Sequence, residues 1–168
     1  MIVECKSCKS RFKLDDAKAE KGGRFKCSKC GEIIEVKKTT GRPKKIIVAD
    51  DTALFRFMME DLLVKKGYEV ITAVDGEDAL IKVKHEMPDL DLLLLDMVMP
   101  KMDGFEVIRE INKGEMGKNL PILTLSGVIK SDEDKAAMKE MGVRGYIDKS
   151  TPPEEILRRV DMLLNPEA

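Results

Sequence analysis

The fold is decided by residues 88–104, which read PDLDLLLLDMVMPKMDG. Within this stretch Leu92 to Leu95 form an apolar run that Asp96 stops. A short, continuous apolar run between polar and turn-forming residues predicts a strand that is buried on both faces. The expected strand covers residues 91–96, and the helix expected after it covers residues 104–112.

The same alternation of strand and helix extends in both directions along the chain. Apolar runs predict further strands at residues 46–49, 69–73, 121–125 and 144–147. Apolar residues at helical spacing predict the remaining helices, which are expected at residues 54–63, 77–86, 132–140 and 153–164. Five such units in series predict an α/β fold, in which a doubly wound parallel sheet carries helices on both faces.

Polar residues collect where the predicted strands end. Asp50 and Asp51 follow the first strand, Asp96 ends the third, Ser126 follows the fourth, and Lys149 lies just beyond the fifth. These ends meet at one edge of a parallel sheet. Three carboxylates repel one another unless a cation lies among them, and oxygen ligands suit Mg²⁺. The lysine offers a second positive charge to a phosphoryl group. Acidic residues scattered over the surface are the alternative, and their placement argues against it.

Four motifs are shared with one known family: the Asp50-Asp51 pair, residues 96–104 (DMVMPKMDG), residues 121–127 (PILTLSG) and residues 145–149 (GYIDK). On these motifs residues 44–164 resemble the receiver domain of two-component response regulators, in particular the chemotaxis-type receivers. The resemblance implies a flavodoxin-like, five-stranded (βα)5 sheet in the strand order 2-1-3-4-5.

The resemblance also implies a phosphoacceptor and a magnesium site. Asp96 matches the phosphoacceptor of the family. Asp51 and Asp96 match the ligands of Mg²⁺, together with the backbone carbonyl of Val98, and Asp50 matches the residue that holds a metal-bound water.

Three further residues match the family's switch and charge-pairing positions. Ser126 corresponds to the hydroxyl that moves toward the phosphoryl group, Lys149 to the lysine that pairs with it, and Tyr146 to the aromatic residue that changes rotamer. Such a domain catalyses only its own phosphorylation and dephosphorylation, so it is not expected to be an enzyme. The sole histidine, His85, is expected on the surface, so the phosphoryl donor is another molecule.

The chain departs from the family pattern at two places. Ser150 stands where the residue after the lysine is usually a proline in a cis peptide, which puts the geometry of that loop in question. The segment 88–96 is two residues longer than usual, and we assign the extra length to the loop that enters the third strand. The residues that border the path of a hydrolytic water in receivers are here Val98 and Val128, both apolar and stiff, which predicts a long-lived phosphorylated state.

Charge divides the chain into two parts. The 168 residues have a formal net charge of −1, with 43% hydrophobic and 36% charged residues. Residues 1–45 hold 14 Lys and Arg against 6 Asp and Glu, whereas the remaining residues hold 16 against 25. This division predicts a first domain at residues 1–36, a charged linker at residues 37–45 and a second domain at residues 46–168.

All four cysteines lie in the basic part, as two C-x-x-C pairs: Cys5, Cys8, Cys27 and Cys30. This spacing is typical of a tetrahedral thiolate site for Zn²⁺, although four thiolates also hold iron. Disulfides or unrelated thiols are the alternative, which the paired spacing disfavours. A segment this small cannot be held together by burial alone and usually needs a metal or disulfides, and zinc would supply that stability.

Residues 2–36 resemble the small prokaryotic zinc ribbons, a β-rich fold. We expect short strands at residues 11–14 and 32–36, packing of Phe25 against Phe12, and a turn at Gly31. Lysines and Arg11 surround the cysteines, so weak contact with nucleic acid is one expectation. A solvated or protein-binding surface is the other.

The combined pattern predicts a response regulator of a two-component phosphorelay. It would accept a phosphoryl group from a histidine kinase and signal by conformational change to a downstream protein that the sequence does not identify, with a homodimer through the receiver face as a further expectation. The alternative is a transcriptional regulator whose ribbon contacts DNA. No apolar run could span a membrane and no signal peptide is evident, so we expect a cytoplasmic protein. No output domain is expected after Leu164.

Overall fold

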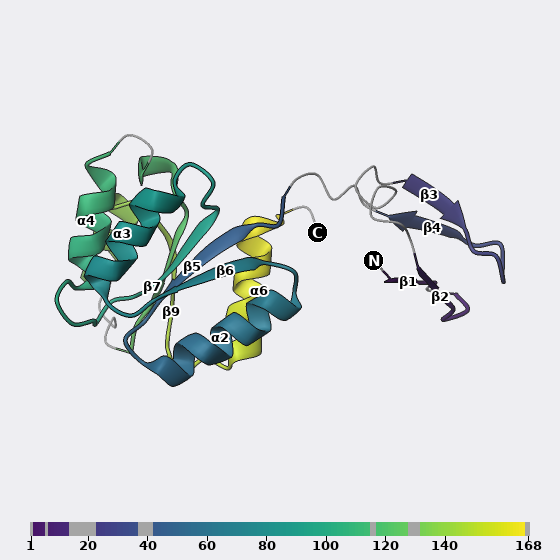
Figure 1. Ribbon diagram of the computed structural model, residues 1–168, viewed down its shortest axis with the longest axis horizontal. Coiled ribbons are helices and arrows are strands. Elements are labelled where there is room, and N and C mark those ends of the chain that lie inside the picture. Colours follow the sequence, from purple (N-terminus) through teal and green to yellow (C-terminus); the bar gives the residue numbers. More distant parts are fainter. Residues whose placement is uncertain are drawn as a thin grey trace. The chain divides into compact units, whose positions relative to one another are not determined.

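A computed structural model describes residues 2–5, 7–13, 23–36, 42–114, 117–127 and 132–166 (Figure 1). The chain divides into two compact units, Met1–Arg42 and Pro43–Ala168. Each unit is described by itself.

The larger unit is built on a five-stranded sheet. Its strands are β5 (Lys45–Ala49), β6 (Glu69–Ala73), β7 (Leu92–Asp96), β8 (Ile122–Leu125) and β9 (Val143–Ile147). All neighbouring strands pair in parallel, in the order β6-β5-β7-β8-β9. Numbered within this unit the order is 2-1-3-4-5, so the predicted flavodoxin-like α/β fold is confirmed.

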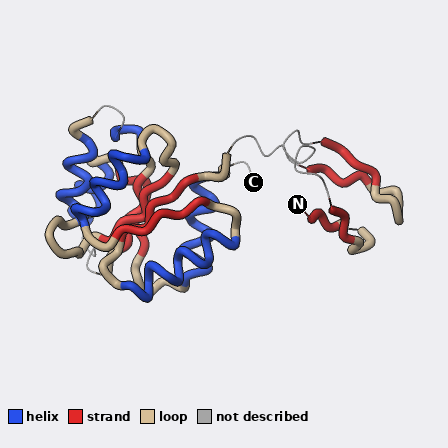
Figure 2. Tube along the Cα trace, in the orientation of Figure 1, coloured by secondary structure: helices blue, strands red, loops and turns tan. Residues whose placement is uncertain are grey.

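Helices cover both faces of this sheet (Figures 1 and 2). They are α2 (Ala53–Lys65), α3 (Gly76–Glu86), α4 (Gly104–Asn112), α5 (Asp132–Glu140) and α6 (Pro153–Leu164), with a short 3-10 turn, η1, at Gly117–Asn119. Side chains from α3, α4 and α5 share one apolar cluster with the sheet, and those from α2 and α6 share a second. The element boundaries lie within a few residues of those predicted from the sequence.

The central strand β7 explains the two clusters. Leu92 to Leu95 are fully buried, and successive side chains of a strand point to opposite faces. Leu93 and Leu95 accordingly pack in the α3–α4 cluster, whereas Leu92 and Leu94 pack in the α2–α6 cluster. Burying each such side chain stabilises the fold by about 1.5 to 3 kcal/mol. The leucine run of β7 therefore contributes to the apolar core on both faces of the sheet.

The smaller unit contains two antiparallel hairpins within its described residues. One pairs β1 (Ile2–Glu4) with β2 (Arg11–Lys13), and the other pairs β3 (Gly23–Lys26) with β4 (Ile33–Val36). Strands β2 and β4 were expected from the sequence, whereas their pairing partners β1 and β3 were not. Packing of Phe25 against Phe12 stays a prediction.

None of the helices in the described part of the chain is long and apolar enough to cross a membrane.

Candidate functional site

The acidic residues of the larger unit meet at the carboxyl ends of β5 and β7. Asp50, Asp51 and Asp96 each offer a carboxylate oxygen, and these oxygens lie within 4.8 Å of one another. Asp50 is fully buried, Asp96 is only 2% exposed, and Asp51 is exposed. Parallel pairing of neighbouring strands brings together residues that lie 46 positions apart in the sequence.

Local hydrogen bonds fix the two buried aspartates. The Asp50 carboxylate accepts a hydrogen bond from the Thr52 amide at 2.8 Å, and the Arg56 guanidinium donates to the Asp50 carbonyl at 2.6 Å. The Val98 amide donates to Asp96 Oδ1 at 3.2 Å. Asp96 Oδ1 is therefore held by its own loop, and Asp50 is held from the start of α2.

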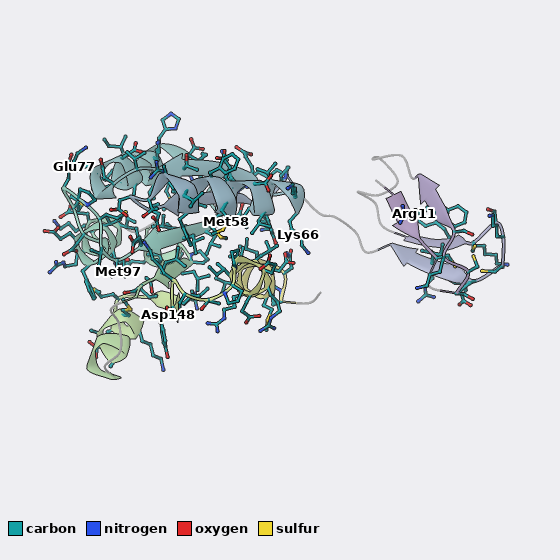
Figure 3. All side chains as sticks on the ribbon, turned by 90° about the horizontal axis from the view of Figure 1, so that it is seen from below. Arg11, Met58, Lys66, Glu77, Met97 and Asp148 are labelled. Carbon is teal, nitrogen blue, oxygen red and sulfur yellow. The ribbon has the colours of Figure 1, made fainter. Side chains whose placement is uncertain are left out.

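Lys149 supplies the counter-charge. Its Nζ donates to Asp96 Oδ2 at 2.6 Å and lies 2.8 Å from Asp50 Oδ2. Met97 and Asp148, the chain neighbours of Asp96 and Lys149, accordingly lie close together in Figure 3. Burial raises the pKa of the Asp96 carboxyl above its usual range, although Lys149 partly offsets this effect. Burial lowers the pKa of Lys149, but the two carboxylates outweigh it and the net shift is upward.

A turn after β9 presents this lysine. Asp148 Oδ1 accepts hydrogen bonds from the Ser150 amide at 2.8 Å and from the Ser150 hydroxyl at 2.7 Å, and the Thr151 amide donates to the Asp148 carbonyl at 2.9 Å. The only cis peptide among the described residues is Met87–Pro88, so the Lys149–Ser150 bond is trans. Where the family pattern has proline, this chain therefore closes the turn with an aspartate side chain.

The loop from Met97 to Asp103 folds back tightly on β7. The Gly104 amide donates to the Met97 carbonyl at 3.1 Å, and a Cβ at Gly104 would lie 2.7 Å from the Asp96 carbonyl oxygen. Only glycine fits this close approach. Asp103 caps α4 through a capping box with Glu106, which fixes the far end of the loop.

Lys101 ties the same loop to α3. Its φ of 66° lies in the left-handed region, and its Nζ contacts Asp75 Oδ2 at 2.6 Å. Asp75 is nearly buried and also caps α3, since it accepts from the Asp78 amide at 2.9 Å. The hydrogen bond from Lys101 lowers the pKa of Asp75.

The predicted switch residues lie on or next to the two strands that follow β7 in the sheet. Ser126 is buried at the end of β8, and its amide donates to the Ile147 carbonyl at 3.0 Å. Tyr146, on β9, is 45% exposed. Val98 is 59% exposed, whereas Val128 lies outside the described residues. His85 is exposed, as expected, beside Glu86.

The three carboxylates fit a hard divalent cation. Asp50 Oδ2 is buried and accepts no hydrogen bond from the described part of the chain, since its contact with Lys149 is an ion pair outside hydrogen-bonding geometry. A buried carboxylate oxygen of this kind suits a metal-bound water, and an all-oxygen ligand set is the one that Mg²⁺ prefers. The donor set therefore fits the Mg²⁺ that the sequence predicts.

The four cysteines form a second cluster, in the smaller unit. Cys5 Sγ lies 3.6 Å from Cys30 Sγ, and Cys8 Sγ lies 3.5 Å from Cys27 Sγ. Both distances are far longer than the S–S bond of about 2.05 Å in a disulfide. They are close to the separation of about 3.8 Å that follows from tetrahedral Zn–S bonds of about 2.3 Å. The cluster therefore fits zinc.

The two cysteine pairs have the same backbone geometry. The Lys9 amide donates to the Cys5 carbonyl and the Gly31 amide to the Cys27 carbonyl, both at 2.9 Å. Lys9 and Gly31 have φ values of 58° and 75°, so the expected turn at Gly31 is confirmed and has a counterpart at Lys9. Such paired turns are a regular way to gather four sulfurs.

The crowded sulfurs also need a cation. Hydrogen bonding with the side chain and backbone of Ser10 lowers the pKa of Cys8 to about 6. The Glu32 amide lowers the pKa of Cys30, but Cys27 and the other sulfurs outweigh it and raise that pKa to about 12. A bound dication allows all four thiols to ionise together, because it neutralises their mutual repulsion.

The sequence pattern did not reveal two contacts of the larger unit. The Lys149 ammonium lies over the ring of Phe55, 5.6 Å from its centroid, and Lys101 pairs with Asp75. Phe55 occupies a helical apolar position that predicts only core packing, and no spacing rule connects residues 75 and 101.

Comparison with known proteins defines the class. Residues 46–161 match the response regulator receiver domain, and residues 1–35 match a zinc-ribbon domain. The chain therefore belongs to the response regulator receiver family and carries an N-terminal zinc ribbon.

Individual relatives show how far the likeness extends. The chain is 39% identical over 122 residues to the alkaline phosphatase synthesis transcriptional regulatory protein PhoP of Bacillus subtilis, covering 72% of this chain and 48% of that protein. It is 34% identical over 128 residues to the chemotaxis protein CheY of Treponema pallidum, covering 76% and 87%. The structure of chemotaxis protein CheY4 of Vibrio cholerae matches with a TM-score of 0.66 and 34% identity, covering 73% of this chain and 99% of that one. The chain spans about half the length of most of the curated relatives it matches.

Proposed function

We propose that the larger unit is a phosphorylation switch in which Asp96 accepts a phosphoryl group. One observation carries the proposal: the nearly buried Asp96 carboxylate lies within a three-carboxylate cluster and contacts the Lys149 ammonium at 2.6 Å. A carboxylate is a weak nucleophile, so alignment and charge neutralisation must supply the catalysis. At the end of β7 the hydrogen bond from the Val98 amide would align the Asp96 carboxylate, and the Lys149 ammonium would supply positive charge.

The transfer forms one bond and breaks one. A carboxylate oxygen of Asp96 attacks phosphorus, the bond from phosphorus to the donor breaks, and its electron pair leaves with the donor. A phosphohistidine donor leaves as an imidazole that takes a proton from water, whereas acetyl phosphate leaves as acetate and needs none. In the later hydrolysis a water oxygen attacks phosphorus and the bond from phosphorus to the Asp96 oxygen breaks. Its electron pair returns to the Asp96 carboxylate, the water gives up a proton to solvent, and inorganic phosphate leaves.

The residues around Asp96 would bind Mg²⁺, neutralise the phosphoryl charge and change conformation on phosphorylation. Asp51, Asp96 and the Val98 carbonyl would hold Mg²⁺, with Asp50 on a metal-bound water. Bound there, Mg²⁺ supplies charge neutralisation for the phosphoryl oxygens. On phosphorylation the Lys149 ammonium moves from Asp96 to one phosphoryl oxygen, and the Ser126 hydroxyl donates a hydrogen bond to another. Tyr146 changes rotamer together with the movement of Ser126.

The partners follow from this chemistry. We propose a histidine kinase as donor and a protein that reads the phosphorylated conformation as recipient, in the cytoplasm. The chain then has no catalytic turnover on other substrates. The zinc ribbon, with Cys5, Cys8, Cys27 and Cys30 as ligands, would be a recognition module.

A nucleic-acid role for the ribbon remains the second proposal. The smaller unit exposes the basic residues Arg11, Arg24, Lys26 and Lys29, and PhoP of Bacillus subtilis is described as a transcriptional regulatory protein. Basic residues alone supply salt-dependent, sequence-independent affinity. Fluorescence polarisation with duplex DNA over a salt series distinguishes DNA contact from protein contact.

The proposed homodimer through the receiver face has its own test. Sedimentation with and without beryllofluoride, a mimic of the acyl phosphate, measures whether the chain dimerises in the phosphorylated conformation.

Labelling with radioactive acetyl phosphate tests the proposed function. The wild-type chain should incorporate label in the presence of Mg²⁺ and lose this ability in EDTA. Asp96→Asn should remove labelling, because an amide is neither a nucleophile nor a good ligand for Mg²⁺. Asp103→Asn is the matched control, since it keeps the cap of α4 and should be labelled normally. Undiminished labelling of Asp96→Asn contradicts the assignment.

A further inference from the structure

Phe55 lies in the first turn of α2, next to the site but outside the set of residues assigned to it above. Its side chain is partly buried against the α2–α6 cluster. The Lys149 ammonium lies over its ring, 5.6 Å from the centroid. We propose that Phe55 is a positioning residue that keeps the Lys149 ammonium in the site when Mg²⁺ is bound, an inference that rests on the proposed function.

The contact has the geometry of a cation–π interaction. The face of an aromatic ring carries negative partial charge and attracts a cation within about 6 Å of the centroid. The side chain of Lys149 is only 28% exposed, so water screens the attraction incompletely. Packing against the core fixes the ring, so little side-chain entropy is lost when the cation settles on it.

The ring matters because of what happens to the other partners of Lys149. Without a metal, the ammonium contacts both Asp50 and Asp96, at 2.8 and 2.6 Å. A dication among the carboxylates neutralises the charge that attracts the ammonium and repels the ammonium directly. Binding of Mg²⁺ therefore weakens the electrostatic attraction that holds the Lys149 ammonium in the site. Phosphoryl transfer, which needs the ammonium in the site, takes place with Mg²⁺ bound.

Phe55 does not lose its attraction at that step. A neutral ring is not a ligand for Mg²⁺, and it does not compete with a phosphoryl oxygen for hydrogen bonds. Among the contacts found in the described residues, the ring is the partner of the ammonium that Mg²⁺ leaves unchanged. It raises the fraction of molecules in which Lys149 stays at the phosphoryl position instead of extending into water.

Nuclear magnetic resonance tests the contact without any reaction. In the full chain labelled at lysine, the ε-methylene protons of Lys149, assigned by their loss in Lys149→Arg, should be shifted upfield by the ring. The shift should remain when Mg²⁺ is added and vanish in Phe55→Leu. Identical ε-methylene positions in the wild type and Phe55→Leu with Mg²⁺ present overturn the proposal.

Stepwise fluorination tests the effect on the reaction. Mono-, di- and trifluorophenylalanine at position 55 weaken the ring's negative face while leaving its shape nearly unchanged. With Mg²⁺ and acetyl phosphate, the logarithm of the labelling rate should fall with each fluorine. The total loss should be about two- to fivefold, which corresponds to about 0.4 to 1 kcal/mol at about 1.36 kcal/mol per tenfold.

Two controls separate this effect from packing. The same series at Phe57, an exposed residue of α2, should leave the rate unchanged. Fluorination at position 55 should also have no effect on the residual labelling of Lys149→Ala. A flat series at position 55, or an equal decline in either control, overturns the positioning role. A wild-type chain that takes no label at all overturns the proposed function, whereas the resonance shift still reports the contact.

Discussion

Replacing Lys149 with methionine should destabilise the chain in a way that Mg²⁺ reverses. The ammonium lies 2.6 and 2.8 Å from two carboxylates that are nearly or fully buried. Methionine keeps most of the length and apolar volume of the side chain, so the substitution removes the charge and little else. Asp50 and Asp96 are then left in the site without a counter-charge.

The expected cost follows from these distances. Carboxylate oxygens within 4.8 Å of one another repel by at least about 3.5 kcal/mol at an effective dielectric constant of about 20. Breaking a buried ion pair from one side costs about 3 to 5 kcal/mol. Because Lys149 is 28% exposed, we reduce this figure to about 2 to 4 kcal/mol at pH 7. With an m-value of about 2 kcal/mol per molar, the urea midpoint should fall by about 1 to 2 M.

The loss should depend on pH and on metal. Burial already raises the pKa of Asp96 above its ordinary value near 3.8, and removing the ammonium raises it further. A raised carboxyl pKa in the folded state means that stability is highest below that ordinary value and is lost as the pH rises through the folded pKa. The deficit of the variant should therefore shrink toward pH 4. Mg²⁺ should restore the midpoint at pH 7 and should stabilise the variant more than the wild type, which retains the repelling ammonium.

Urea unfolding followed by circular dichroism at 222 nm measures these quantities, because the helices in the described part of the chain all lie in the larger unit. Lys101→Met is the matched control, since Lys101 also pairs with one nearly buried carboxylate, that of Asp75, but is itself 57% exposed. It should cost about 1 kcal/mol or less and show no extra stabilisation by Mg²⁺. A Lys149→Met variant as stable as the wild type, or one that Mg²⁺ does not restore, refutes the reasoning.

Three other predictions concern the metal, the lifetime and the donor. The chain should bind one zinc that Cys27→Ser abolishes, and chelation should unfold the smaller unit while leaving the urea midpoint of the helices unchanged; simultaneous collapse of both units would show that the two cores are not separate. Val98→Asn should speed loss of the phosphoryl group several-fold in a label-decay assay, because the amide of asparagine orients a water, with an unchanged affinity for Mg²⁺; an unchanged decay rate contradicts this. Leu54→Asp with Phe57→Asp should cut transfer from a phosphohistidine protein by about tenfold, because both apolar side chains of the first turns of α2 are at least 70% exposed, yet leave labelling by acetyl phosphate intact; equal losses in both assays would indicate misfolding instead of a docking surface.

Much of the larger unit follows from the sequence because its signals are long and agree with one another. Buried runs such as Leu92 to Leu95 are typical of central strands in a parallel sheet, and parallel strands bring their carboxyl ends together. The residue pattern therefore predicts that Asp50 and Asp96 lie at the same edge of the sheet. The family's strand order then completes the sheet, and the observed pairing agrees with it.

The remaining features depend on contacts between residues with no fixed spacing. The turn at Asp148 and Ser150 replaces a proline by hydrogen bonds, which composition alone does not indicate. The ring of Phe55 meets Lys149 across 94 positions of sequence because α2 and the end of β9 converge in three dimensions. In the smaller unit, Lys9 takes a backbone conformation usually left to glycine while its amide donates a hydrogen bond to the Cys5 carbonyl.

The most direct test of the central claim is to locate the phosphoryl group. The full chain is incubated with acetyl phosphate and Mg²⁺, the acyl phosphate is reduced with borohydride to homoserine, and the tryptic peptides are sequenced by mass spectrometry. We expect homoserine at position 96 alone, and no homoserine when Mg²⁺ is removed. Homoserine at position 50 or 51, or a chain that yields none, contradicts this expectation.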